Sequence, residues 1–216
     1  MRIFAILGAL AIAGDAPADP VREPHPGIET PLIASTPPAR SVHWADVLEP
    51  IDVVSVSSRA RASVRLYARD GSVDVTARDT FEQIAASAGE AHRLAVRLEQ
   101  LVVKAAYHFR KSRVLVVSGW RPHAGRHSTG DAVDFKLEGV RAPQLAAYLR
   151  QLPRAGVGVY THPRTQFVHL DVREPSYHWI DASPPGVKWH EARLRDPSAS
   201  RRDSSWTPEM DLPSSG

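Results

Sequence analysis

Two short stretches of the sequence carry residue types that commonly hold metal ions. His127 and Asp134 stand seven positions apart with Gly130 between them, and His169 and Asp171 follow later as a His-x-Asp pair. Apolar and polar residues alternate in both stretches as in β-strands, which predicts that Asp134, His169 and Asp171 all face away from the core. His127 would reach this face from the preceding loop, because Gly130 allows a sharp turn. Three nitrogen or oxygen ligands with a fourth position left to water are typical of a catalytic zinc site.

Several motifs occur in an order that resembles one family. The segment His127–Asp134 has the His-x-x-Gly-x-Ala-x-Asp form of D-alanyl-D-alanine-type metallopeptidases, the peptidase M15 superfamily, which is grouped with lysostaphin-like zinc enzymes and the hedgehog signalling domain. Ser118–Pro122 resembles the Ser-Gly-Tyr-Arg segment that precedes this motif. Segments similar to the later half of the YcbK-like murein endopeptidase branch follow: Gly156–Tyr160, Phe167–Asp171 and Trp179.

This resemblance, which covers roughly residues 63–179, implies a bound zinc ion held by His127, Asp134 and His169. It also implies that Arg121 lies beside the scissile bond, where it would hold a substrate carboxylate or stabilise the oxyanion. Asp171, two residues beyond His169 on the same face, is the candidate general base. Two alternatives stay open: Asp171 binds the metal while His169 assists, or Asp171 only orients a ligand.

The sequence also departs from the family pattern. The loop that follows Arg121 is short, which predicts altered substrate contacts. The Glu-x-Trp-His signature of the D,D-dipeptidases has no clean copy, since Val187 stands where the acid should precede Trp189-His190. His178 occupies a position where the branch tends to have an arginine, and neither His178 nor His123 is assigned a role.

Periodicity and turn signals predict the elements that position these residues. Asp70-Gly71 indicates a hairpin, and capping boxes predict helix starts at Thr80 and Ser87. A later helix would bury one apolar face, and Pro143 would open another helix. The first face consists of Leu94, Leu98, Leu101, Ala105 and Phe109. Strands are predicted at 114–117, 132–137, 156–160 and 167–172. Because helices precede most of the short strands, the expected fold is α+β, with a small, mainly antiparallel sheet, helices packed on one face and the zinc site on the open face.

The ends of the chain differ in composition from its middle. A basic start, an apolar run from Ile3 to Ala13 and the small residues up to Ala18 indicate a signal peptide over residues 1–18, cleaved after Ala13 or Ala18. The run is shorter than the ~20 residues that a membrane-spanning helix needs. We expect a proline-rich tether at 19–41, the zinc peptidase domain at 42–184 and a charged, Pro/Ser-rich tail at 185–216, disordered from Arg195 onward.

Composition narrows the class of protein. The 216 residues give room for one domain with a proper core, and the net charge of +3 is compatible with an anionic polymer such as a cell wall. No basic patch with interleaved aromatic residues indicates nucleic-acid binding. The absence of cysteine excludes disulfides, thiolate zinc sites, a cysteine nucleophile and a lipoprotein anchor.

Together these features predict a periplasmic or secreted zinc peptidase that hydrolyses peptide bonds in peptidoglycan, as a crosslink endopeptidase or a D-amino-acid carboxypeptidase. No stable membrane span is expected after signal cleavage. One alternative is a zinc-containing, non-catalytic module that binds peptidoglycan or a protein. Another is a murein amidase, which could use the same site chemistry. The sequence does not determine the bond that is cut, the protein partners or the oligomeric state.

Overall fold

The computed structural model describes residues 43–86, 92–187 and 192–213, all within the compact unit Pro38–Gly216. The predicted signal peptide and tether lie outside these ranges, as does the Trp189-His190 pair. Within the described ranges, none of the helices combines the length and the apolar character needed to cross a membrane.

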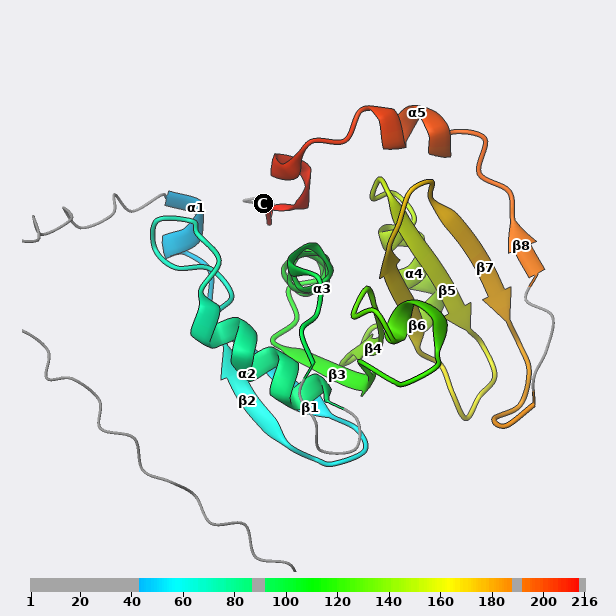
Figure 1. Cartoon of the computed structure of the whole chain (residues 1–216), viewed down its shortest axis with the longest axis horizontal. Coiled ribbons are helices and arrows are strands. Elements are labelled where there is room, and N and C mark those ends of the chain that lie inside the picture. The colour runs from blue at the N-terminus through cyan, green and yellow to red at the C-terminus, as the bar shows by residue number, and fades with distance from the viewer. Residues whose placement is uncertain (1–42, 87–91, 188–191, 214–216) are drawn as a thin grey trace, which may run out of the picture. The chain divides into compact units, whose positions relative to one another are not determined.

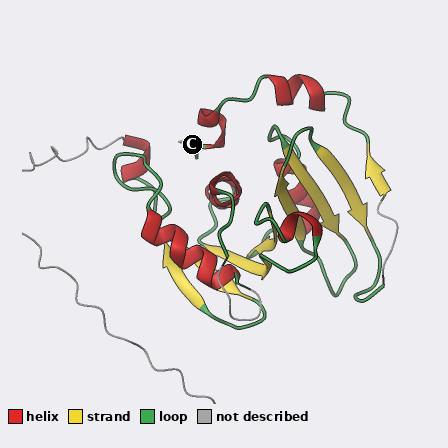
Figure 2. Cartoon of the chain, viewed as in Figure 1, coloured by secondary structure: helices red, strands yellow, loops and turns green. Residues whose placement is uncertain are grey.

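Eight strands form one sheet, with helices and short 3-10 turns between them (Figures 1 and 2). The strands are β1 (Ile51–Ser55), β2 (Arg61–Val64), β3 (Arg113–Ser118), β4 (Ala132–Leu137), β5 (Ala155–Tyr160), β6 (Val168–Val172), β7 (Tyr177–Asp181) and β8 (Ala192–Leu194). The helices are α1 (His43–Asp46), α2 (Val75–Ala85), α3 (Val96–His108), α4 (Ala142–Leu149) and α5 (Ala199–Ser204), with 3-10 turns η1 (Gly125–His127) and η2 (Pro208–Asp211).

The sheet has the strand order β2-β1-β3-β4-β6-β5-β7-β8. Neighbours pair antiparallel except for β1 with β3 and β5 with β7, which are parallel. The predicted α+β class with a mainly antiparallel sheet is therefore confirmed. The sheet is larger than the small one expected, because β1, β7 and β8 were not foreseen. β7 carries Tyr, His and Trp in succession, and its parallel pairing with β5 is not visible in a local pattern.

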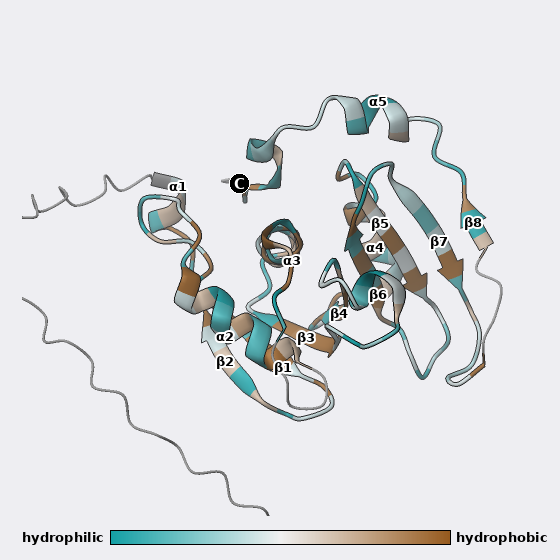
Figure 3. Ribbon diagram, in the orientation of Figure 1, coloured by the Kyte–Doolittle hydropathy of each residue, from teal (hydrophilic) through white to brown (hydrophobic). Residues whose placement is uncertain are grey.

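Helices α2, α3 and α4 pack their apolar residues against one face of the sheet. Leu98, Leu101 and Ala105 of α3 are fully buried and belong to the same core cluster as Phe135 of β4 and Leu170 of β6. Figure 3 shows the hydrophobic colouring concentrated in α3, β3 and β5. Full burial of each of these leucine and phenylalanine side chains contributes roughly 1.5–3 kcal/mol to folding. The predicted apolar helix face is thus confirmed for these three residues of α3, whereas Leu94 precedes the helix and Phe109 follows its last residue. The opposite face of the sheet is left for polar side chains.

The region before α3 differs from expectation. The predicted hairpin is reduced to an antiparallel bridge between Tyr67 and Val73 around the turn at Gly71, whose φ is 82°, because the chain enters α2 at Val75. Asp74 caps this helix, since its Oδ1 accepts a hydrogen bond from the Ala77 N–H at 2.8 Å. The predicted start at Thr80 is wrong because Asp74 offers an N-cap six positions earlier. The capping box predicted at Ser87 lies outside the described residues.

Residues 192–213 also correct a prediction, because they fold against the domain and are not a disordered tail. β8 pairs with β7, and Asp203 of α5 accepts hydrogen bonds from the backbone N–H and the hydroxyl of Ser176, each at 2.7 Å. Asp211 pairs with Arg97 of α3 at 2.8 Å. Both aspartates are buried, so charged residues that suggested a solvated tail are instead used as specific anchors.

Candidate metal centre

The register of two central strands brings the candidate ligands together. β4 and β6 are antiparallel neighbours in which Asp134 lies directly opposite His169. His127 ends η1 and is joined to β4 by a turn at Gly130, whose φ of 78° suits glycine. A Cβ atom on Gly130 would lie 2.2 Å from the backbone oxygen of Arg93, so the turn also needs the missing side chain.

The site is less open than the sequence suggested. His127, Asp134 and His169 are only 3%, 5% and 8% exposed, respectively. Trp179 of β7 lies beside His169, with 5.0 Å between the ring centroids, and the η1 loop brings His127 over the strands. The expected open face is therefore largely covered at this point by side chains from other elements.

One atom from each of the three residues points to a common centre. His169 Nδ1 lies 2.9 Å from Asp134 Oδ1 and 3.2 Å from His127 Nε2, and His127 Nε2 lies 3.5 Å from Asp134 Oδ1. Bonds of about 2.05 Å from zinc to nitrogen or oxygen place tetrahedral ligands about 3.3 Å apart. The three observed separations scatter around that edge length, so the residues fit a single small cation.

The other ring nitrogens fix the tautomers that such a cation requires. His127 Nδ1–H donates to the carbonyl oxygen of Gly119 at 2.7 Å, which leaves the Nε2 lone pair facing the centre. His169 Nε2–H donates to Asp171 Oδ2 at 3.1 Å, which leaves Nδ1 facing the centre. Metal-binding histidines are held in this way by carbonyl or carboxylate groups behind them.

The pKa values of Asp134 and His169 indicate that the cluster holds a positive charge. Burial by itself would raise the pKa of Asp134, but hydrogen bonds to His127 and His169 outweigh burial and hold that pKa well below its usual range. Burial would lower the pKa of His169, yet Asp134 and Asp171 raise it to about 9. Three converging acceptor atoms therefore need a positive charge among them, and a proton on His169 or a metal ion supplies it.

Asp171 stands behind His169 and does not reach the three converging atoms. Its carboxylate is fully buried, faces the Nε2 edge of His169 and accepts from Nε and Nη2 of Arg173, both at 2.5 Å. Burial would raise the pKa of Asp171, but His169 and Arg173 lower it. The group of converging ligand atoms therefore contains His169 and not Asp171.

Arg121 and His123 occupy the loop at the rim of the site. The guanidinium of Arg121 donates to Asp134 Oδ2 at 3.2 Å, and its side chain is 44% exposed. Arg121 therefore links a buried candidate ligand to solvent. His123 is exposed and has a positive φ of 55°, and no contact of its side chain with the three ligands is seen among the described residues.

His178 lies on the other face of the sheet. It follows Tyr177 and precedes Trp179 on β7, so it points away from the face on which Trp179 meets His169. Its nearest ionic partner is Asp196, 3.6 Å away, and burial lowers its pKa to about 4. His178 is therefore separate from the candidate metal centre.

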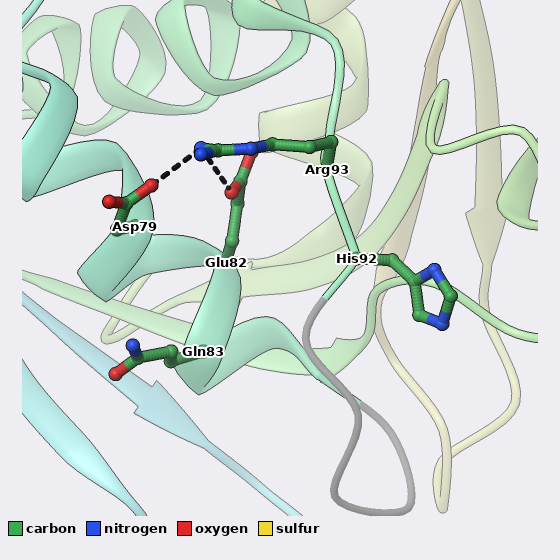
Figure 4. Close-up of a pocket in the computed structure, with 5 residues that line it drawn as sticks. All are labelled: Asp79, Glu82, Gln83, His92 and Arg93. Atoms are coloured by element: carbon green, nitrogen blue, oxygen red, sulfur yellow. Dashed lines mark hydrogen bonds and ion pairs between the residues drawn. The ribbon is translucent and has the colours of Figure 1, made fainter. Parts of the chain in front are cut away.

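A second cluster of acidic groups forms an ion-pair network. Arg93 donates to Asp79 at 2.5 Å and to Glu82 at 3.0 Å, while Gln83 and His92 complete the lining of a pocket (Figure 4). Glu82 also accepts from Arg78 at 3.0 Å and from the backbone N–H of Leu94 at 2.9 Å. These carboxylates are already neutralised by guanidinium groups, which makes this pocket a poor place for a metal ion.

Sequence reasoning assigned no role to Gly119, Arg173 or Gly156, all of which support the site. The signal for Arg173 was its position two residues after Asp171, since alternate residues of an extended chain share a face. The contribution of Gly119 is a backbone carbonyl, which no residue type reveals.

Comparisons with known proteins cover the part of the chain that contains this site. Residues 101–179, which contain all three candidate ligands, match the family model described as peptidoglycan L,D-endopeptidase MepK. Over these residues the chain is therefore similar to the M15 peptidase superfamily, as the sequence motifs suggested. Peptidoglycan L,D-endopeptidase MepK proteins from Escherichia coli strain K12 and from Shigella flexneri are 38% identical over 53 residues, which is 24% of this chain. The aligned part spans 28% of the length of these curated relatives. No solved structure matches the chain.

Proposed function

We propose that this protein is an exported zinc peptidase of the M15 superfamily that hydrolyses peptide bonds in peptidoglycan. The observation that carries the proposal is the convergence of His127 Nε2, Asp134 Oδ1 and His169 Nδ1 within 4.8 Å of one another. The match to a family of peptidoglycan endopeptidases supports peptidoglycan as the substrate class. The basic start and short apolar run at the N-terminus favour export to the compartment where peptidoglycan lies.

In this proposal the three residues hold zinc, and each surrounding group has one task. Zinc bound there would supply a water of pKa near 7 and polarise the scissile carbonyl. Gly119 keeps the proton of His127 on Nδ1, away from the metal. Arg121 stands at the solvent side of Asp134, where its guanidinium can turn toward a substrate carboxylate or the developing oxyanion.

Asp171 is better placed to orient His169 than to act as the general base. Its two oxygens bind Arg173, and one of them also accepts from the ring edge that faces away from the ligand centre. To take a proton from water at the centre, Asp171 would have to leave both partners. Asp171→Asn separates the roles, because an amide oxygen can still accept from Nε2–H but is a poor base. Near-normal zinc binding with turnover lost by several orders of magnitude would restore the base assignment.

Metal dependence is the first experiment. A chelator should abolish the release of peptides from purified murein, and zinc should restore it. His127→Ala and His169→Ala should each lose both zinc and hydrolysis, whereas His108→Ala, an exposed histidine of α3, should keep both. Full hydrolysis by either ligand variant would refute this site.

Product analysis then tests the bond and the alternatives. The relatives are named L,D-endopeptidases, which favours cleavage of a crosslink over removal of a terminal D-amino acid. Mass spectrometry of the soluble products should therefore show opened crosslinks. Free stem peptides separated from the sugar chains would indicate a murein amidase. Sedimentation with the wall and no released product would indicate a binding module.

A further inference from the structure

Arg173 forms a bidentate ion pair with the buried carboxylate of Asp171. Its Nε donates to Oδ1 and its Nη2 to Oδ2, the two-pronged arrangement that fixes a carboxylate most firmly. Arg126 approaches the same carboxylate only at 3.5 Å, and its side chain is 41% exposed. Asp171 in turn accepts a hydrogen bond from His169 Nε2–H. By fixing the carboxylate, Arg173 therefore also fixes the orientation of the imidazole.

Gly156 and two aromatic rings form the space that the side chains of Asp171 and Arg173 occupy. Gly156 of β5 lies opposite Asp171 in the register. A Cβ atom on Gly156 would lie 2.1 Å from Asp171 Oδ2 and 2.4 Å from Arg173 Nε, so the glycine makes the space that carboxylate and guanidinium share. On its other side, the Arg173 guanidinium lies 5.3 Å from the Tyr177 ring centroid and 5.7 Å from that of Trp179. These aromatic faces favour a cation and limit its hydration.

We infer that Arg173 and Gly156 are positioning residues, which lock Asp171 so that His169 keeps its Nδ1 lone pair on the metal centre. The inference rests on the proposed metal site. A carboxylate that is free to rotate would still accept a hydrogen bond from Nε2–H, but it would not fix the plane of the imidazole. Groups that orient a metal-binding histidine typically change metal affinity by 10–100-fold when they are removed.

The test compares Arg173→Met, Arg173→Lys and Gly156→Ala in the full chain. Binding of Zn²⁺ is measured by competition with a chromophoric chelator, and site geometry is measured from the visible spectrum of the Co²⁺-loaded protein. Arg193→Met is the matched control, because Arg193 also lies over the Tyr177 ring, at 5.1 Å, but has no contact with Asp171 among the described residues. Circular dichroism establishes that each variant is folded.

We expect Arg173→Met to weaken Zn²⁺ binding at least tenfold and to change the Co²⁺ spectrum. Arg173→Lys, which keeps the charge but not the two-pronged contact, should fall between Met and wild type. Gly156→Ala should reproduce the Met result even though Arg173 is present, since its new Cβ displaces flexible side-chain ends and not backbone. Combining Gly156→Ala with Arg173→Met should add little.

Three outcomes are decisive. Wild-type affinity and an unchanged Co²⁺ spectrum in folded Arg173→Met or Gly156→Ala would overturn the inference while leaving the metal site intact. An equal loss in Arg193→Met would also overturn it, because the effect would then come from loss of any arginine over Tyr177. Failure of the wild-type chain to bind Zn²⁺ or Co²⁺ at all would instead refute the proposed metal site, and the positioning role with it.

Discussion

The metal-free chain should carry a histidine that titrates far above the usual range. Asp134 and Asp171 lie 2.9 Å and 3.1 Å from the two ring nitrogens of His169. Burial by itself lowers the pKa of this ring, but the two carboxylates raise it to about 9, compared with an ordinary value of 6.5. This difference corresponds to about 3 kcal/mol. The sign follows from linkage: the stabilisation is fully present below about pH 6.5 and is lost as the pH rises through about 9.

Zinc binding should depend on pH because of the same proton on His169. The metal needs the unprotonated Nδ1 of His169, so below pH 9 it must displace a proton. From this group alone, the apparent zinc affinity should rise about tenfold per pH unit between pH 7 and pH 9. Asp171→Asn removes one of the two charges that raise the pKa, so it should shift the titration of His169 toward 6.5 and flatten the pH dependence of zinc binding.

Nuclear magnetic resonance of the chain labelled at histidine and treated with a chelator measures this directly. The His169 ring signals should move with a midpoint near pH 9 in the wild type and should stop titrating once zinc is added. The spectrum of His169→Ala assigns the signals. A midpoint near 6.5 in the metal-free wild type would show that the two carboxylates do not act on His169 as the geometry indicates.

Three further variants test the scaffold. Asp203→Ala should lower the free energy of unfolding by roughly 3 kcal/mol, because it leaves the buried donors of Ser176 without their charged acceptor; urea denaturation measures this. Leu101→Ala in the centre of α3 should lower it by about 2–5 kcal/mol without weakening zinc binding, since Leu101 is fully buried in the core on the helix-covered face of the sheet and the ligands are on the other face. Gly158→Ala should displace the indole of Trp179, because its Cβ would lie 2.3 Å from that ring, and tryptophan fluorescence should shift.

Matched surface changes serve as controls for these variants. Ser200→Ala alters α5 at an exposed position, and Val96→Ala alters α3 at a side chain that is 40% exposed. Each should change the free energy of unfolding by less than about 0.5 kcal/mol. A stable Asp203→Ala protein would mean that residues 192–213 are not anchored through this carboxylate.

Local patterns predicted the central strands and the α3 face well. The run Ala132–Leu137 became β4 at the expected residues, and Leu98, Leu101 and Ala105 are buried together. The prediction of a disordered C-terminal tail was wrong because contacts with residues far away in the sequence order this segment. Asp203 and Asp211 belong to a charged, proline-broken stretch, yet partners more than twenty-five residues away in sequence bury them. Composition alone cannot reveal such pairing.

The sequence by itself determined which side chains share a face, because alternation along an extended chain fixes the side of every second residue. Alternation placed Asp134 and His169 on one face, and the resemblance to a known family added His127 from the preceding loop. Only the tertiary structure decided the register that sets Asp134 opposite His169 and the contact that turns Asp171 toward Arg173. The physical reason is that strand alternation is a local property of covalent geometry, whereas register and second partners depend on segments that meet only when the chain folds.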